Sequence, residues 1–264
     1  MSSRSRRLHV VTTRSNPLQW SVPDRIYHEW AQHMLASGVH LTVVECQYGD
    51  RPFTCRIPGV HHVGGRADSL TWVKERCLNI GISRLPDDWN YVAWIDSDIF
   101  FRRPDWARET VEALQQFDVI QPWTDCYDLG PDGGHMLVHR SFCRMWMDGE
   151  PILQGPGAHR SPYRFAHPGY AWAARRSALS SLGGGWLIRR FSALRIIIWR
   201  WLWPGGCGRA GLQGFPRGTG DPFCSGRSGP DAMSRGISGR LPGRSSIIST
   251  DRSATGPMRG AGTS

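Results

Sequence analysis

The sequence lacks any run of about 18 apolar residues free of charge, which is the length that a membrane-spanning helix needs. Its most apolar stretch, residues 186–204, is interrupted by Arg189, Arg190, Arg195 and Arg200. No apolar leader follows the polar start, and the seven cysteines show no CxxC spacing. We therefore expect a cytoplasmic protein with reduced thiols and no transmembrane segment.

The first 185 residues have almost no net charge, although the whole chain carries +10 and has an isoelectric point near 9.8. Residues 1–185 hold 20 of the 32 basic and 19 of the 22 acidic residues, which leaves +1. Residues 186–264 hold 12 Arg and 3 Asp, contain neither Glu nor His, and carry +9. A basic chain favours a nucleic-acid or anionic-membrane partner, but here the basicity belongs to the C-terminal segment.

The most informative stretch that is present runs from Tyr91 to Asp98. Its apolar residues Tyr91 to Ile95 predict a buried parallel strand, and Asp96 and Asp98 follow at its carboxyl end. Because the two carboxylates lie on the same side of an extended chain, they can converge on one hard divalent cation. Such a site completes its shell with water and ligand phosphates, so a diphosphate-bearing substrate is expected. An Asp-x-Asp can also arise by chance in a surface turn, but the preceding apolar run favours a site.

Strands and helices alternate along the first 185 residues, which predicts an α/β fold with a mostly parallel sheet flanked by helices. The stretch from Thr124 to Pro168 is predicted to be irregular and to shape a second-substrate pocket. Within it, His135 and His139 do not have convincing metal-ligand spacing. The predicted strands are 8–12, 39–45, 60–63, 91–95 and 119–123, and the predicted helices begin near Ser21, Leu70, Pro104 and Arg175.

Three features together resemble a glycosyltransferase of the GT-A type, family-2-like: the strand ending in Asp-x-Asp, the segment 71–81 before it, and the loop 167–172 after it. The resemblance covers roughly residues 8–185 and implies a Rossmann-type, mixed, mostly parallel sheet. It also implies a nucleotide-diphospho-sugar donor, an Mn²⁺ or Mg²⁺ cofactor, and an acceptor that is an unidentified glycan, lipid or protein. Residues 1–185 would form the nucleotide-sugar-binding domain.

The resemblance also implies roles for individual residues. Asp96 and Asp98 would be the metal ligands, with Asp96 also on the donor. The remaining donor-binding candidates are Thr12, Arg14, Asn16, Arg66 and Lys74, and the acceptor or sugar loop would contain His167, Gly169, Tyr170 and Trp172. Tyr170 and Trp172 can equally be packing residues.

The family pattern stops near Gly183 to Gly185, because neither the acidic general base nor the closing His-rich segment follows. Read one register away with permitted codons, residues 193–203 can spell Ser-Ala-Asp-His-His-Met-Ala-Leu-Ala-Leu, and residues 245–251 can spell Leu-His-His-Gln-His-Gly. Both resemble the missing family segments, in the right order and in one register. We therefore expect a frameshift near Gly183 to Gly185, a disordered or irregular tail over residues 186–264, and impaired catalysis.

The sequence is also compatible with other functions. A nucleotidyltransferase on a similar sheet would begin with a Gly/Arg-rich phosphate loop after the first strand, which residues 13–17 lack. A nucleic-acid-binding protein acting through its basic tail, or a tail helix at a membrane interface, would account for the charge. The tail arginines spread around a helical wheel, which argues against an interfacial helix, and nucleic-acid binding ranks below sugar transfer.

Overall fold

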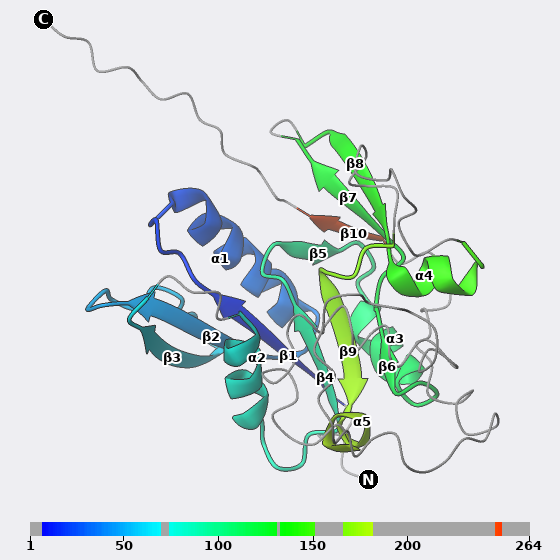
Figure 1. Ribbon diagram of the computed structural model, residues 1–264, viewed down its shortest axis with the longest axis horizontal. Coiled ribbons are helices and arrows are strands. Elements are labelled where there is room, and N and C mark those ends of the chain that lie inside the picture. Colours follow the sequence, from blue (N-terminus) through cyan, green and yellow to red (C-terminus); the bar gives the residue numbers. More distant parts are fainter. Residues whose placement is uncertain (1–6, 70–73, 131–132, 151–165, 182–245, 250–264) are drawn as a thin grey trace, which may run out of the picture.

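The computed structural model describes residues 7–69, 74–130, 133–150, 166–181 and 246–249 (Figure 1). Its main sheet has six strands in the order β3-β2-β1-β4-β9-β6. The four strands from β3 to β4 are parallel, and β9 runs antiparallel to both β4 and β6. The predicted mixed, mostly parallel sheet flanked by helices is therefore confirmed. The strands are β1 (Leu8–Arg14), β2 (His40–Tyr48), β3 (His61–Ala67), β4 (Tyr91–Ile95), β6 (Val119–Ile120) and β9 (Ala171–Arg175).

Helices cover both faces of this sheet, because β1 and β4 alternate apolar side chains toward each face. On one face, Trp30 of α1 and Trp106 of α3 pack in the large core together with Val10. On the other face, Val11 packs against Leu78 of α2. The helices are α1 (Ser21–Ala36), α2 (Lys74–Ser83), α3 (Trp106–Ala113), α4 (Phe142–Met147) and α5 (Arg176–Ser181).

Close contact between α2 and the sheet depends on Gly81. A Cβ atom at this position would lie 2.4 Å from Cγ1 of Val11 and 3.0 Å from Cγ2 of Val44, closer than packed carbon atoms approach. Gly81 therefore lies within α2, and it lets the helix backbone approach β1 and β2.

A second sheet has the order β5-β10-β7-β8, which corrects one expectation and includes four residues of the tail. The stretch after Thr124 is not irregular throughout, because β7 and β8 form an antiparallel hairpin and α4 follows it. Four residues of the predicted irregular tail form β10, which pairs antiparallel with β5 and parallel with β7. The rest of the tail and the proposed frame change lie outside the described residues. The strands of this sheet are β5 (Ile99–Phe101), β7 (Asp125–Leu129), β8 (His135–Arg140) and β10 (Ser246–Ser249).

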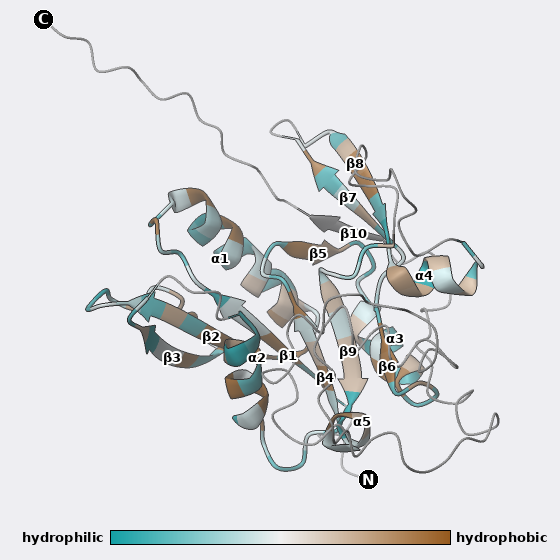
Figure 2. Cartoon of the chain, viewed as in Figure 1, coloured by the Kyte–Doolittle hydropathy of each residue, from teal (hydrophilic) through white to brown (hydrophobic). Residues whose placement is uncertain are grey.

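Hydropathy follows this architecture (Figure 2). The short strand β5, directly after the Asp-x-Asp turn, is hydrophobic along its length, and Ile99 and Phe101 are buried in the large core. This anchors the chain immediately after the acidic pair. Among the described residues, no helix has the length and apolar character needed to cross a bilayer.

Candidate active site

The acidic pair lies where the strand order of the sheet reverses. From β1 the chain continues to β2 and β3 on one side of β1, and it then returns to form β4 on the other side. In open α/β sheets, ligands bind beyond the carboxyl ends of the strands at such a switch point. β4 ends at Ile95, so Asp96 stands directly at this edge, beside the end of β1.

Backbone hydrogen bonds hold the turn that carries the acidic pair. The N–H of Asp96 donates to the carbonyl of Tyr170 over 2.9 Å, and the N–H of Ile99 donates to the carbonyl of Asp96 over 3.2 Å. Trp30 of α1 donates from Nε1 to the carbonyl of Ile99 over 2.9 Å. Asp96 and Asp98, both half-buried, are thus presented on a turn fixed on both sides.

Lys74, the first residue of α2, donates from Nζ to Oδ1 of Asp96. Each of the two side chains is about one-third exposed, at 33% and 32%, so the pair borders solvent and a ligand can reach it. The structure therefore brings two of the residues suggested for donor binding into direct contact, although they are 22 positions apart in the chain.

The end of β1 and the loop after it use their polar side chains mainly to hold the local backbone in shape. Arg14, 8% exposed, pairs with Asp24 of α1, and Asn16 donates to the same carboxylate over 3.2 Å. Asn16 also exchanges two hydrogen bonds with the backbone of Trp20, over 2.8 and 3.1 Å. Thr12 is buried at 1% exposure. Thr12 and Arg14 belong to β1, and Asn16 lies in the loop after it. Thr12 is turned into the protein, while Arg14 and Asn16 meet at Asp24.

Arg66 is held away from the acidic pair. It donates to the carbonyls of Gly49 and Arg51, and its guanidinium lies over the ring of Phe53 at 5.0 Å. None of these contacts reaches Asp96, so the structure does not bring Arg66 together with Lys74.

The loop from His167 to Trp172 packs next to the Asp96 turn. The rings of His167 and Tyr170 stack with centroids 4.0 Å apart and planes 9° apart. Tyr170 has a positive φ of 71°, a conformation that costs free energy in a non-glycine residue and that clusters at functional sites. The N–H of Gly169 donates to Nδ1 of His167 over 3.1 Å, and a Cβ on this glycine would lie 2.9 Å from the same ring. The loop is therefore tightly folded around His167.

Burial and the neighbouring His139 lower the pKa of His167 to about 4. His167 is therefore neutral at pH 7, and because Nδ1 accepts from Gly169, its proton lies on Nε2. Trp172 belongs to β9 rather than to a loop, and it is buried at 4% exposure with Nε1 donating to the carbonyl of Pro168 over 2.8 Å. Trp172 is thus a packing residue, one of the two possibilities that the sequence allowed.

Sequence reasoning did not find the pair formed by His139 and Asp128. Nε2 of His139 lies 2.8 Å from Oδ2 of Asp128, and the ring of His139 is 5.1 Å from that of His167. His135 stacks on Tyr127 instead, at 4.7 Å. The segment Pro131-Asp132-Gly133-Gly134 lies between two stretches in which apolar and polar residues partly alternate, a pattern that indicates a β-hairpin. That pattern would have placed His139 on the strand opposite the one that contains Asp128.

Asp96 and Asp98 provide oxygen donors of the type that Mg²⁺ and Mn²⁺ prefer. Within the described part of the chain, no group of three His, Cys, Asp or Glu side chains is placed to hold a metal ion. The two carboxylates fit a cation whose other ligands are water and diphosphate oxygens, and they do not fit a cation held by protein side chains alone.

Glu45, near the carboxyl end of β2, organises the edge next to the site. It is 1% exposed and accepts hydrogen bonds from the backbone N–H groups of Thr54 and Cys55 over 2.7 and 3.0 Å. Gln47 and His62 also contact its carboxylate, over 2.8 and 2.7 Å. Burial alone would raise the pKa of Glu45, but these hydrogen bonds outweigh it and lower the pKa to about 2.

We expect Glu45→Gln to lower the free energy of unfolding by about 3 kcal/mol at neutral pH, because an amide replaces a charged acceptor of several hydrogen bonds. The folded-state pKa lies below the ordinary value of 4.5, so this stabilisation is complete above that value and is lost as pH falls toward 2. Urea denaturation at pH 7 and at about pH 3 should therefore give a smaller difference at the lower pH.

The matched control is Glu112→Gln, which removes an exposed i,i+4 ion pair with Arg108 on α3. It should cost less than about 0.5 kcal/mol. An equal cost of Glu45→Gln at both pH values would contradict the hydrogen-bond explanation.

No family model matches this chain, and no curated protein sequence matches it. Similar solved structures exist. A protein from Desulfovibrio desulfuricans G20, described as a nucleotide-diphospho-sugar transferase, is 12% identical with a TM-score of 0.33, and it covers 65% of this chain. This chain spans only 63% of that protein's length.

Two further structures illustrate the range of similar folds. A glycosyltransferase involved in glycosylation of the major capsid of PBCV-1 is 9% identical with a TM-score of 0.32, covering 77% of this chain and 79% of its own. The 4-diphosphocytidyl-2C-methyl-D-erythritol synthase from Anaerococcus prevotii is 11% identical with a TM-score of 0.37, covering 74% and 83%. Two of these similar structures are described as sugar transferases. At such low sequence identities and TM-scores, these likenesses say nothing about function, which must be inferred from the site.

Proposed function

We propose that this protein is a glycosyltransferase that takes a sugar from a nucleotide-diphosphate donor. The observation that carries this proposal is the Asp96-Ser97-Asp98 turn at the carboxyl end of β4, with Lys74 bonded to Asp96 at the point where the strand order reverses. Two carboxylates and one ammonium at a ligand-binding edge suit a substrate that arrives as a metal-bound diphosphate.

The two carboxylates would hold Mn²⁺ or Mg²⁺ together with the diphosphate, and the ion would neutralise negative charge on the leaving diphosphate. Lys74 supplies a further positive charge at the same place. Because its pair with Asp96 borders solvent, Nζ can turn from the carboxylate to a phosphate oxygen when the donor binds.

The stacked rings of His167 and Tyr170 support a position for the transferred sugar. The carbonyl of Tyr170 accepts from the N–H of Asp96, so the stack and the acidic turn are joined through the backbone. Aromatic faces beside polar groups suit the apolar face of a sugar ring. In this proposal the loop positions the sugar, while the acidic turn and Lys74 hold the diphosphate.

Calorimetric titration of the full chain with UDP, GDP and CDP, each with Mn²⁺ and with EDTA, tests the proposal. We expect binding of at least one nucleotide that needs the metal ion. A folded sample that binds none of the three would overturn the proposal. Preference for a nucleoside triphosphate with a sugar phosphate as co-substrate would identify a nucleotidyltransferase instead. DNA binding that weakens steeply with salt would identify nucleic-acid binding through the tail.

A further inference from the structure

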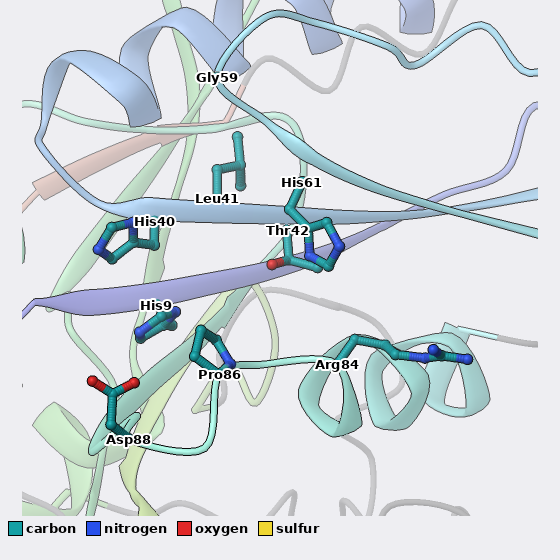
Figure 3. A pocket seen from close by; sticks show the side chains of 9 residues that line it. All are labelled: His9, His40, Leu41, Thr42, Gly59, His61, Arg84, Pro86 and Asp88. Carbon is teal, nitrogen blue, oxygen red and sulfur yellow. The ribbon is translucent and has the colours of Figure 1, made fainter.

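A cavity of about 390 Å³ lies at the amino-terminal ends of β1, β2 and β3, at the opposite edge of the sheet from the acidic turn. Figure 3 shows its lining, which includes His9 from β1, His40 and Thr42 from β2, and His61 from β3. Nothing in the proposed sugar transfer uses these residues. Cavities of this size hold small organic ligands.

Strand register places two buried polar side chains on the cavity side of the sheet. His9 is the register partner of His40, and Thr42 lies two residues after His40 on the same strand. Register partners and residues two apart along a strand point to the same face. His9 and Thr42 are therefore diagonal neighbours on one face, and they are only 7% and 3% exposed.

This face is the one that α2 covers farther along the strands. Val11, two residues after His9, packs in the core beneath α2, but the helix ends at Ser83. A sheet face beside a helix is normally apolar, as it is at Val11. The buried imidazole and hydroxyl of His9 and Thr42 depart from this pattern, and they do so where the cavity replaces the helix.

The wall of the cavity does not supply hydrogen bonds to these two side chains. Arg84, Pro86 and Asp88 are all exposed, and in Figure 3 the Arg84 side chain extends away from His9. Pro86 has no polar side-chain atom. Asp88 is close enough to His9 to act on its charge, yet within the described part of the chain no hydrogen bond joins them.

Neither His9 nor Thr42 has a hydrogen-bonding partner for its side chain among the residues that the structure describes. The side-chain atoms that are sealed from solvent and lack a partner belong to Arg14, Asn79 and Asp128 instead. The ring nitrogens of His9 and the hydroxyl of Thr42 are therefore open to accessible space, and both residues line the cavity. Because buried polar groups are nearly always hydrogen-bonded in folded proteins, these two call for a partner inside the cavity.

The chemistry of the two side chains defines that partner. Burial, and secondly the nearby His40, lower the pKa of His9 to about 4, although Asp88 opposes this shift, so His9 is neutral at pH 7. The His9 ring also stacks on His40 with centroids 4.9 Å apart, which fixes its orientation. A neutral imidazole has one N–H donor and one acceptor nitrogen, and a hydroxyl both donates and accepts. A matching ligand is therefore uncharged and carries a donor as well as an acceptor.

We propose that this cavity binds a small uncharged carboxamide or lactam, whose polar atoms bond to His9 and Thr42. Such a group has an N–H donor and a carbonyl acceptor side by side. Each of the two buried side chains gains the partner that it lacks, while the rest of the ligand lies against Pro86 and Gly59. A metal ion is a poor occupant, because no three ligand-type side chains in the described residues are placed to hold one.

Three probes with one ring test the proposal on the full chain: nicotinamide, N,N-dimethylnicotinamide, which lacks the amide donor, and nicotinate, which is an anion at pH 7. We expect nicotinamide to bind at least ~10-fold more tightly than either of the others, measured by NMR titration. Saturating UDP with Mn²⁺ should not displace it, because the acidic turn lies at the other edge of the sheet. This comparison does not depend on any variant.

Two substitutions assign the contacts. His9→Phe keeps an aromatic ring beside His40, and Thr42→Val keeps the shape of the side chain, so each removes hydrogen bonding with little change in packing. Each should weaken nicotinamide binding by at least ~5-fold. His28→Phe makes the same change at an exposed histidine of α1 and should leave the affinity unaltered.

Circular dichroism checks that each variant is folded. Equal binding of the three probes or no binding up to about 10 mM would overturn the proposal. So would unchanged nicotinamide affinity in both folded variants, or displacement of nicotinamide by UDP with Mn²⁺. Metal-dependent binding of UDP is measured separately, so a failure here leaves the proposed sugar transfer untouched.

Discussion

Replacing Asp98 with Asn should weaken the metal-dependent binding of a nucleoside diphosphate by at least ~100-fold. Asp98 stands in the turn between β4 and β5, and the buried residues on either side, Ile95 and Ile99, fix its position. The described residues offer no cluster of three metal ligands, so each of the two carboxylates accounts for much of the protein's hold on the ion. An amide has nearly the same shape but lacks the charge, so the fold should persist while metal affinity falls.

Asp96→Asn should have a comparable effect on nucleotide binding and an additional effect on Lys74. Its loss of charge removes the present partner of the Lys74 ammonium group, whereas the backbone bond to Tyr170 remains. Calorimetric titration with the best nucleotide and Mn²⁺ measures both variants, and Glu112→Gln serves as the exposed control. If Asp98→Asn bound nucleotide with unchanged affinity and still required Mn²⁺, the metal would have to lie elsewhere.

Lys74 provides a second measurement, because it is the only lysine of the chain. An amine-reactive label detected by mass spectrometry therefore reports on Lys74 and the terminal amino group alone. Nucleotide with Mn²⁺ should protect Lys74 from labelling in the unaltered protein and should give little protection in Asp98→Asn. Equal protection of Lys74 in the unaltered protein and in Asp98→Asn would show that Lys74 does not respond to the metal-bound diphosphate.

The central part of this fold could be predicted from sequence because its signals are local. The buried strand β4 and the acidic pair after it are readable from one apolar run and its abrupt end. The helix predicted to begin near Ser21 does begin there, although its N-cap residue is Trp20 and no side chain caps it. By contrast, β9 consists of Ala171, Trp172, Ala173, Ala174 and Arg175, and alanine has low strand propensity, so the sequence suggested a loop. Tertiary pairing with β4 and β6 determines this strand.

Site residues were harder to predict wherever a side chain's role depends on burial. Thr12, Arg14 and Arg66 have the chemistry of donor-binding residues, but the structure buries the first and gives the others protein partners. Lys74 reaches Asp96 because α2 crosses the sheet and begins at its carboxyl edge, a relation that residue spacing does not contain. The pair of Asp128 and His139 likewise depends on the hairpin between β7 and β8.

The second large effect is expected from restoring the reading frame near Gly183 to Gly185. As written, residues 186–264 contain no His, and their only carboxylate side chains are Asp221, Asp231 and Asp251, which lie in Gly-, Pro- and Ser-rich surroundings that do not match the family pattern. The general base and the closing histidines implied by the family resemblance are therefore not encoded in this frame. General-base catalysis typically contributes ~10²–10⁴-fold, and a group misplaced by about 1 Å can cost ~10²-fold. The repaired protein should therefore turn over a nucleotide sugar at least ~100-fold faster than this chain.

The position of β10 gives this prediction a structural basis. Ser249 pairs with Ile99, which directly follows Asp98, and β10 also runs parallel to β7. Residues 245–251, which include β10, can spell Leu-His-His-Gln-His-Gly in the shifted register. If the repaired segment keeps this place in the second sheet, it brings histidines to the strand that follows the acidic turn. A histidine at this place would be a candidate third metal ligand beside the acidic pair. The described residues of the present chain contain no group of three side chains placed to hold a metal ion.

Two measurements distinguish a missing general base from weakened metal binding as the cause of slow sugar transfer. The DNA around the codons for Gly183 to Gly185 should yield, after a one-base change, a long reading frame that contains acidic residues and histidines. The repaired protein should bind Mn²⁺ more tightly and release sugar from the donor, and Asp98→Asn in the repaired protein should abolish both gains. If restoring the frame tightens metal binding but leaves turnover equal to that of this chain, the base does not come from the restored segment. Tighter metal binding without faster turnover would show that metal affinity does not limit the reaction. A carboxylate within residues 1–185 would then have to act as the general base that takes the proton from the acceptor hydroxyl.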